Sequence, residues 1–146
     1  MVEAINASWK WMQVEAKEVV RTNLFGNIIF NDVQGKFWRL CPEKLSCDLI
    51  AVDQEGLDSI IGQEEFQADW EMEDMVEAAK SKLGDLPEGS VYCLKFPPVL
   101  GGSYDESNLG TIDHEALIKF SGEMAFQIKD LPDGAKFNID LEGLVP

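Results

Sequence analysis

The chain has 146 residues, with 27 acidic and 12 basic side chains, a formal net charge of −15 and a pI near 4.2. Its length suits one compact domain, which we expect to span residues 1–146. Hydrophobic residues make up 45% of the sequence, a content that excludes a disordered acidic tail. The negative charge argues against nucleic acid as a direct partner, because binding phosphates requires clustered lysine and arginine.

The sequence lacks the patterns of a membrane or secreted protein. No apolar run approaches the ~20 residues that a membrane-spanning helix needs, and the first ten residues hold no apolar core of a secretory signal. We therefore expect a cytoplasmic protein without a membrane partner. Cys41, Cys47 and Cys93 form no C-x-x-C pair. We expect them to be reduced and buried, with a metal site or a redox pair as the alternative. His114 is the only histidine, so we predict no metal site. We also expect no other cofactor.

The first eight residues are weakly patterned. If the residues that follow are extended, Trp9 and Trp11 share one face, which favours an aromatic lid over a core. Val19 and Val20 then lead toward the first strong strand pattern.

The clearest local pattern is a β-hairpin. The β-branched and aromatic run at residues 24–30 predicts one strand, and residues 36–40 predict its partner. Between them, Asp32 and Gly35 occupy the first and fourth positions expected of a type I turn. Another strand is expected over residues 47–52.

The middle of the chain predicts three short helices. Asp53 is expected to cap the first helix, and Gly62 to close it. Phe66 and Trp70, four residues apart, indicate a second helix, and Gly84 ends a third. The apolar residues at helical spacing face inward, so the carboxylates between them are left facing solvent.

A strand, a loop and a helix follow. Residues 91–96 predict a strand, and residues 109–112 a short edge strand. Asp113 is expected to cap a final helix with an apolar side that continues to Leu131, and residues 136–139 predict a last strand. Early strands followed by helices indicate an α+β fold, with a largely antiparallel sheet and helices packed against it.

One short pattern occurs twice. The runs DLPEG at 85–89 and DLPDG at 130–134 each follow a helix and precede a strand-like run. Proline, then an acid, then glycine is ordinary turn chemistry. We therefore interpret the two runs as the same joint used twice, and not as a sign of duplication.

The negative charge is concentrated in one stretch. Between Lys44 and Lys80 the chain has no lysine or arginine, whereas the rest holds 16 acids against 12 bases. The stretch contains eleven carboxylates: Asp48, Asp53, Glu55, Asp58, Glu64, Glu65, Asp69, Glu71, Glu73, Asp74 and Glu77. Such a surface is typical either of a docking site for a basic partner or of a solvated face that keeps a protein soluble.

Enzymatic motifs are weak. Gly101-Gly102-Ser103 is not followed by the lysine and serine or threonine of a phosphate loop, and Asp113-His114 has no nucleophile turn nearby. The adjacent acids Glu64-Glu65 and Glu73-Asp74 lie on helix surfaces, not in a cleft at a defined separation. An enzyme is therefore the least favoured class.

Three runs in a fixed order carry a family resemblance: FGNIIF at 25–30, GKFWRL at 35–40 and PPVLGGS at 97–103. Together they resemble the conserved domain at the C-terminus of type VI secretion immunity proteins that neutralise DNase effectors. The resemblance extends over about residues 9–139. Characterised members resemble two-domain chains, and this sequence matches their later domain. The resemblance implies an α+β fold without catalytic residues. It also implies that the protein binds a co-produced toxin.

Charge supports the same hypothesis independently. A nuclease toxin has a basic cleft, and an acidic inhibitor can occupy that cleft as a phosphate mimic. We therefore expect an immunity protein whose partner is a basic toxin, with the oligomeric state left open. The alternative is a small regulatory or ligand-binding domain with an acid face that serves solubility only.

The predicted partner-binding surface is centred on the junction between the second and third predicted helices. Its charged members set the encounter rate, and its apolar members form an anchor. The predicted residues are Glu64, Glu65, Phe66, Asp69, Trp70, Glu71, Glu73 and Asp74. The loop at residues 97–105 is the alternative position.

Overall fold

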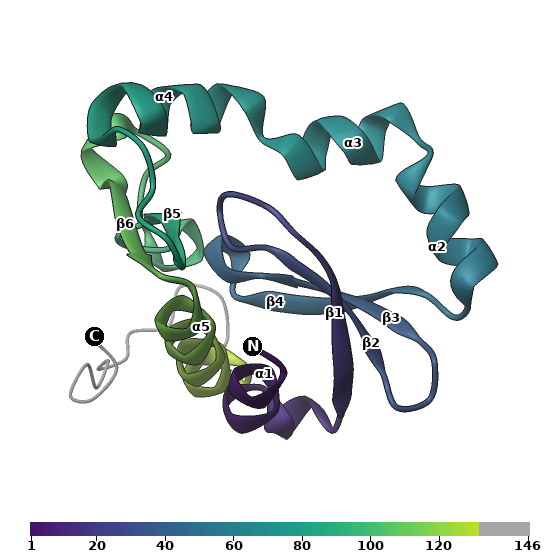
Figure 1. Cartoon of the computed structure of the whole chain (residues 1–146). Coiled ribbons are helices and arrows are strands. Elements are labelled where there is room, and N and C mark those ends of the chain that lie inside the picture. Colours follow the sequence, from purple (N-terminus) through teal and green to yellow (C-terminus); the bar gives the residue numbers. More distant parts are fainter. Residues whose placement is uncertain (132–146) are drawn as a thin grey trace.

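The protein has two antiparallel sheets in a computed structural model that describes residues 1–131 (Figure 1). One sheet has the strand order β1-β2-β3-β4, and the other pairs β5 with β6. The strands are β1 (Ala16–Thr22), β2 (Ile28–Asp32), β3 (Phe37–Cys41), β4 (Ser46–Ala51), β5 (Ser90–Leu94) and β6 (Leu109–Asp113). The helices are α1 (Val2–Ser8), α2 (Gln54–Ile61), α3 (Glu64–Glu71), α4 (Glu73–Leu83) and α5 (His114–Ile128). The predicted α+β class, with helices packed against a largely antiparallel sheet, is confirmed.

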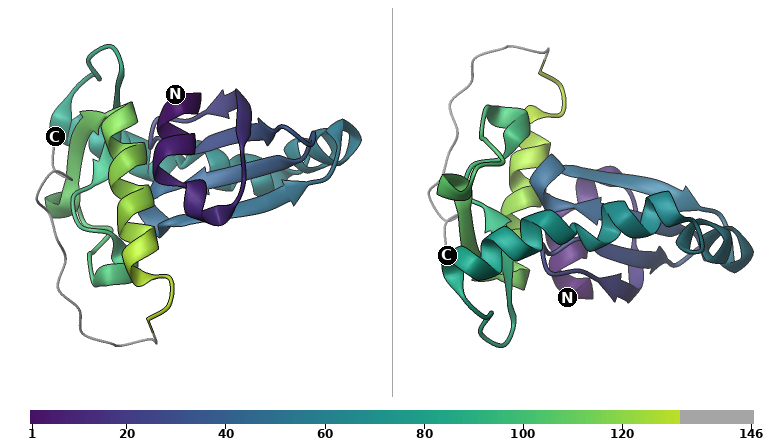
Figure 2. Two further views of the ribbon diagram at one scale, coloured as in Figure 1. Left: turned by 90° about the horizontal axis from the view of Figure 1, so that it is seen from below. Right: turned by 90° about the horizontal axis from the view of Figure 1, so that it is seen from above.

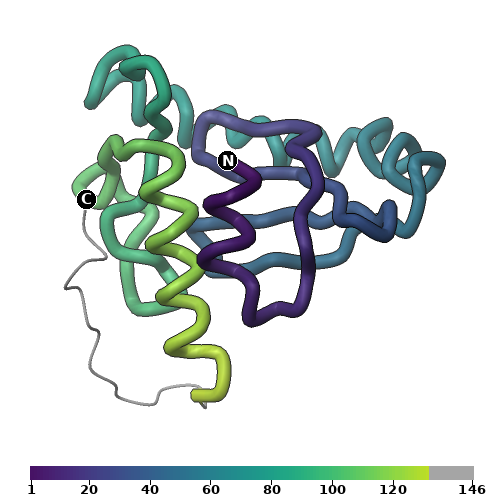
Figure 3. Tube along the Cα trace, turned by 60° about the horizontal axis from the view of Figure 1, so that its bottom comes forward, coloured from purple at the N-terminus to yellow at the C-terminus, as the bar shows by residue number. Residues whose placement is uncertain are grey.

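Helices cover both faces of the four-stranded sheet (Figure 2). On one face, α1 and α5 lie side by side, as Figure 3 shows, and Ile118 of α5 packs with Ile28 of β2. On the other face, Leu57 of α2 and Trp70 of α3 pack with Ile29. Because both faces of β2 are covered, Ile28, Ile29 and Phe30 are all apolar instead of alternating with polar residues.

The second sheet is joined to the first through the segment before β2. Phe25 is buried there against Tyr92 of β5, with 5.9 Å between the ring centroids, and Ala79 of α4 belongs to the same cluster. The backbone N–H of Tyr92 donates to the carbonyl of Leu24 at 2.8 Å. The helices α2, α3 and α4 form a continuous arch from the first sheet to the second (Figure 1).

The predicted hairpin turn is confirmed. The N–H of Gly35 donates to the carbonyl of Asp32 at 3.0 Å, and Gly35 has φ +84°, a conformation that glycine adopts without strain. The Asp32 carboxylate accepts hydrogen bonds from the N–H groups of Gln34 (2.8 Å) and Lys36 (2.9 Å) and from Nε1 of Trp38 (2.9 Å). This carboxylate therefore holds the turn and the start of β3 together.

Two predicted helix caps are also confirmed. The Asp53 side chain accepts a hydrogen bond from the N–H of Gly56 at 2.8 Å. The Asp113 side chain accepts one from the N–H of Ala116 at 3.0 Å. Each carboxylate satisfies an orphan donor and lies at the positive end of its helix.

The extended conformation predicted around Trp9 and Trp11 is wrong. Residues 2–8 form α1, and Lys10–Met12 form a 3-10 turn. The two rings nevertheless stack on each other, 5.6 Å between centroids. They donate Nε1–H to α5 carbonyls, Trp9 to Ile118 and Trp11 to Gly122, each at 3.2 Å. The aromatic pair thus joins α1 to α5, a tertiary role that local sequence spacing does not reveal.

Two element boundaries also differ from the prediction. The strand expected at residues 24–30 begins only at Ile28, because Asn23 closes a turn with two hydrogen bonds to the N–H groups of Phe25 and Asn27. Helix α5 ends at Ile128, before Leu131. The strand predicted at residues 136–139 lies outside the described residues. No helix within residues 1–131 combines the length and the apolar character needed to cross a membrane.

The predicted burial of the cysteines is confirmed for two of the three. All three are free, with Cys41 and Cys47 buried and Cys93 half-buried. Burial, together with the nearby Glu43 carboxylate, raises the pKa of Cys41. Burial also raises the pKa of Cys47 to about 12 and that of Cys93 to about 11. These thiols are protonated at neutral pH, as expected of structural cysteines.

The hydrogen bonds to the Asp32 carboxylate predict how the stability of the protein depends on pH. Burial acts to raise the pKa of Asp32, but the hydrogen bonds from Trp38, Lys36 and Gln34 together outweigh it, so the pKa lies below the ordinary value of 3.8. The stabilisation is therefore fully present above pH 3.8 and is lost as the pH falls through the folded-state pKa. We expect Asp32→Asn to lower the free energy of unfolding by about 1–2 kcal/mol at pH 7.

Urea denaturation from pH 7 to pH 2.5 measures this difference between the two proteins. It should stay constant until the pH approaches 3.8 and then shrink, because the wild-type carboxylate becomes protonated. A difference that does not change with pH would show that the charge of Asp32 does not hold the turn.

Candidate functional site

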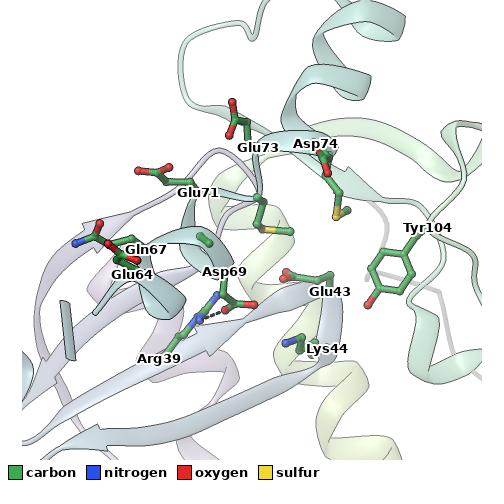
Figure 4. Close-up of a pocket in the computed structure, with 13 residues that line it drawn as sticks. Arg39, Glu43, Lys44, Glu64, Gln67, Asp69, Glu71, Glu73, Asp74 and Tyr104 are labelled. Carbon is green, nitrogen blue, oxygen red and sulfur yellow. Dashed lines mark hydrogen bonds and ion pairs between the residues drawn. The ribbon is translucent and has the colours of Figure 1, made fainter. Parts of the chain in front are cut away.

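A groove of about 710 Å³ lies under the junction of α3 and α4 (Figure 4). We call it the acid groove. It is lined by Arg39, Glu43, Lys44, Glu64, Gln67, Ala68, Asp69, Glu71, Met72, Glu73, Asp74, Met75 and Tyr104. Six of these side chains are carboxylates and two are cations, so the lining carries a formal charge of −4.

Arg39 of β3 fixes the helical wall of the groove to the sheet. Its Nη1 forms an ion pair with the Asp69 carboxylate of α3 at 2.5 Å. Its guanidinium carbon lies 5.2 Å from the ring centroid of Trp70 and 5.7 Å from that of Phe66. The Arg39 side chain is only 14% exposed, so these contacts are screened less by water than those of a surface ion pair.

A buried polar network continues beneath Arg39. Nε and Nη2 of Arg39 donate to Oδ1 of Asn27 at 3.3 and 3.1 Å, and Asn27 is fully buried. Nδ2 of Asn27 donates to the Glu43 carboxylate at 2.9 Å, and the Cys41 thiol donates to the other oxygen of Glu43 at 3.0 Å. Glu43 is 8% exposed, and these hydrogen bonds offset the cost of burying its charge.

The bend between α3 and α4 is held by Asn23. Its Nδ2 donates to the carbonyl of Trp70 at 2.9 Å, one of the carbonyls that the end of α3 leaves without a helical partner. Met72 follows in the left-handed conformation, with φ +49°, and separates the two helices. Glu71 and Glu73 flank this residue, so the bend brings the acids at the end of α3 close to those at the start of α4.

The opposite wall is Tyr104, which is 55% exposed. Figure 4 shows its ring across the groove from Glu64 and Gln67, with Glu43 and Lys44 between them. Asn108 holds the loop, because its Nδ2 donates to the carbonyls of Phe96 (2.8 Å) and Ser103 (2.7 Å). At Gly102 a Cβ atom would lie 1.8 Å from the Phe96 carbonyl oxygen, so only glycine fits there.

The predicted partner-binding residues divide into two groups. Glu64, Asp69, Glu71, Glu73 and Asp74 come together in the lining of the acid groove, and Glu65 is exposed beside it. Phe66 and Trp70 do not line the groove.

Those two aromatic residues instead attach α3 to the sheet. Their rings stack at 6.0 Å, Phe66 is half-buried, and Trp70 is only 7% exposed. Little of Trp70 is therefore available to contact a partner. The apolar surface inside the groove comes from Met72, Met75 and Tyr104.

Sequence reasoning missed the floor of the groove. Arg39, Glu43 and Lys44 belong to β3 and the turn after it, about 20 residues or more before the first acid of α3 in the sequence. No local signal marks them, because their role depends on how α3 crosses the sheet. Tyr104 falls in the loop at residues 97–105 that was the alternative position for the interface. The predicted helical surface and Tyr104 of the alternative loop therefore line the same groove.

Nothing in the groove resembles a metal centre. Within residues 1–131 no three His, Cys, Asp or Glu side chains are grouped to hold a metal ion. The site consists of a concave, mainly acidic surface with a small apolar patch, an arrangement suited to binding a cationic surface.

Comparisons with known proteins relate the chain to a protein family and to a solved structure. Residues 54–125 match the model of a family described as "T6SS immunity protein Tdi1, C-terminal". A crystal structure of Atu4351 from Agrobacterium tumefaciens shares the fold, with a TM-score of 0.58 and 17% sequence identity. The match covers 83% of this chain and 62% of that one, so this chain spans less than two thirds of its length. No curated protein matches the chain.

The Arg39 network generates a stability prediction. We expect Arg39→Met to lower the free energy of unfolding by about 2–4 kcal/mol, because it leaves the buried Asn27 Oδ1 without a donor and removes the cation above Phe66 and Trp70. By contrast, Asp69→Asn should cost less than about 1 kcal/mol, since the Asp69 side chain is 53% exposed.

Urea denaturation of both variants measures the two costs. Equal, small losses would mean that the network does not attach α3 to the sheet.

Proposed function

We propose that this protein is an immunity protein that binds and neutralises a basic protein toxin of a type VI secretion system through the acid groove. The match of residues 54–125 to the immunity family supports the class of protein. The observation that carries the position of the site is the convergence of five predicted acids and Tyr104 on one concave surface.

Electrostatics supports a cationic partner. The carboxylates of the groove outnumber its cations, and Arg39 is already paired with Asp69 and Asn27. A surface of this kind attracts a basic protein over a Debye length of about 10 Å and speeds encounter. Speed is useful to an immunity protein because each free toxin molecule can damage the cell that contains it.

The arrangement of the groove fits a protein surface better than a small ligand. Its apolar centre, formed by Met72, Met75 and Tyr104, is surrounded by exposed carboxylates. Protein interfaces commonly have such an apolar anchor within a polar rim. We infer that Tyr104 contributes binding energy while the acids set the association rate and orientation.

We infer further that the toxin is a nuclease and that it is neutralised in the cytoplasm. A nuclease must bind phosphates, so its active cleft is basic and complementary to a row of carboxylates. In this proposal the protein acts by occupying that cleft, without catalysis, and as a single immunity-type domain. The acid groove then imitates the charge of a nucleic acid backbone.

The alternative function is a regulatory or ligand-binding domain with acids that only confer solubility. One observation keeps it open: acidic side chains such as Asp53, Glu55 and Asp58 lie outside the groove, on or beside α2. The two functions differ in whether the groove acids affect association with a basic partner.

Neutralising exposed groove acids tests the proposal. The variant combines Glu64→Gln, Glu71→Gln, Glu73→Gln and Asp74→Asn, and it leaves Asp69 in place because that residue pairs with Arg39. We expect it to associate with the toxin encoded beside this protein's gene at least about tenfold more slowly at low salt, with a weaker salt dependence. Stopped-flow association at two ionic strengths measures both effects.

A matched control neutralises four exposed acids outside the groove, Glu3, Glu15, Glu88 and Glu123. It changes the net charge by the same amount and should reduce the rate much less. Equal effects of the two variants would favour a role of net charge alone. If the groove variant behaves like the wild type at both salt concentrations, the acids serve solubility and the proposed interface is wrong.

A further inference from the structure

Glu43 is the buried carboxylate of the acid groove. It is 8% exposed, whereas the other five acids that line the groove, all on α3 and α4, are exposed. Glu43 belongs to the short turn Pro42–Lys44 that follows β3. Figure 4 shows it on the floor of the groove, between Asp69 and Tyr104. The lining of the groove therefore includes one carboxylate that is almost fully removed from water.

Both hydrogen-bond donors to Glu43 are neutral groups. They are the Asn27 amide, 2.9 Å from one carboxylate oxygen, and the Cys41 thiol, 3.0 Å from the other. No cationic group within the described part of the chain forms an ion pair with Glu43, and Arg39 pairs with an acid of α3 instead. The carboxylate is therefore hydrogen-bonded at both oxygens, but its charge has no counter-ion among these residues.

A buried carboxylate without a counter-ion is a strong acceptor for a cation that enters from outside. An ionised carboxylate offers about four acceptor positions, and the two hydrogen bonds to Glu43 occupy only two of them. Charges that are removed from water attract each other more strongly, and salt screens them less, than charges on an open surface. A cation paired with Glu43 is therefore held more firmly than one paired with the exposed acids of α3 and α4.

The surroundings of Glu43 also suit a long cationic side chain. Met72, Met75 and Tyr104 line the same groove and form its apolar part. Lysine and arginine carry their charge on an apolar stem of about three or four methylene groups, which packs against apolar surface of this kind. The face of a tyrosine ring also attracts cations. The groove thus combines apolar walls with a buried negative charge on its floor.

We propose that Glu43 binds the charged group of one lysine or arginine side chain of the toxin, inserted into the acid groove. This inference rests on the proposed function of the groove and adds a feature that the toxin must present. A toxin without a cation at this position covers Glu43 and removes its remaining contact with water, which is costly for an unpaired charge. The exposed acids speed the encounter with any basic surface, whereas Glu43 selects the toxin that stays bound.

The substitution Glu43→Gln tests the inference in the complex with the toxin encoded beside this protein's gene. It removes the charge but keeps the size of the side chain and one acceptor oxygen. We expect the complex to dissociate at least about tenfold faster, with an association rate within about threefold of the wild type, because losing one partner of a buried charge pair acts on dissociation. Stopped-flow association and surface plasmon resonance measure the two rates, and the faster dissociation should persist at both ionic strengths.

Cys41→Ala is the matched structural control. It removes a donor to Glu43 from the same buried network but leaves the carboxylate charged. Its complex should dissociate within about threefold of the wild-type rate, and urea denaturation shows whether both variants are folded. If Cys41→Ala accelerates dissociation as much as Glu43→Gln does, the shape of the floor matters and its charge does not, and the inference is wrong.

A scan of the toxin identifies the cation and requires no change at Glu43. Each lysine and arginine of the toxin is replaced in turn by methionine, and dissociation from the wild-type protein is measured. We expect one replacement to accelerate dissociation at least about tenfold. The same replacement should have less than about a threefold further effect on the complex of Glu43→Gln, because the two groups act as one pair. Exchanging lysine and arginine at that position shows which charged group binds more firmly.

Failure of this inference differs from failure of the proposed function. If Glu43→Gln dissociates like the wild type while the groove variant associates slowly, the groove binds the toxin but Glu43 receives no cation. If several toxin cations contribute equally and none couples to Glu43, the attraction is spread over the groove, and the inference is again wrong. If neither variant changes association or dissociation, the toxin binds elsewhere and the proposed function of the groove fails as well.

Discussion

The acidic surface of this protein depends on one cation beneath it. Arg39 donates to Asn27 from the sheet, pairs with Asp69 of α3 and lies against the rings of Phe66 and Trp70. Helix α3 carries four acids in eight residues and no base, and Phe66 and Trp70 are its residues in the apolar cluster at the sheet. A guanidinium can meet a carboxylate, an amide and two rings at once because it is planar and has five donors. Arg39 therefore attaches α3 without neutralising the acids that face the solvent.

Concentrating carboxylates has an energetic cost that the surrounding structure partly offsets. Like charges repel at short range, and Glu71 lies at the end of α3, where the helix dipole disfavours a negative charge. Glu64 and Glu73, in contrast, lie in the first turns of α3 and α4, where the dipole favours them. Breaking the arch into short helices provides several N-terminal turns for acids, whereas one long helix would provide only one. The left-handed Met72 permits this division.

Much of the fold could be predicted from the sequence because its signals are local. The Asp32–Gly35 turn and the Asp53 and Asp113 caps all depend on residues within four positions of one another. The conformation around Trp9 was predicted wrongly because both tryptophans bind carbonyls of α5, more than a hundred residues away. The same distinction applies to the candidate site. The acids of its helical wall form a visible run, whereas Glu43 and Tyr104 reach the groove only through tertiary structure.

The match to the immunity family adds a further distinction within the groove. The matched residues 54–125 include the helical wall and Tyr104, but not the sheet that carries the floor. Arg39 of the floor belongs to the run GKFWRL, and Asn27, which accepts its hydrogen bonds, belongs to the run FGNIIF. In the structure the two runs hold the wall of the groove in place. Asn27 is fully buried and holds Arg39, which holds α3. Exchanging an exposed acid of the wall, such as Glu64 or Glu71, alters the groove at one point, whereas losing Arg39 would displace every acid on α3 at once.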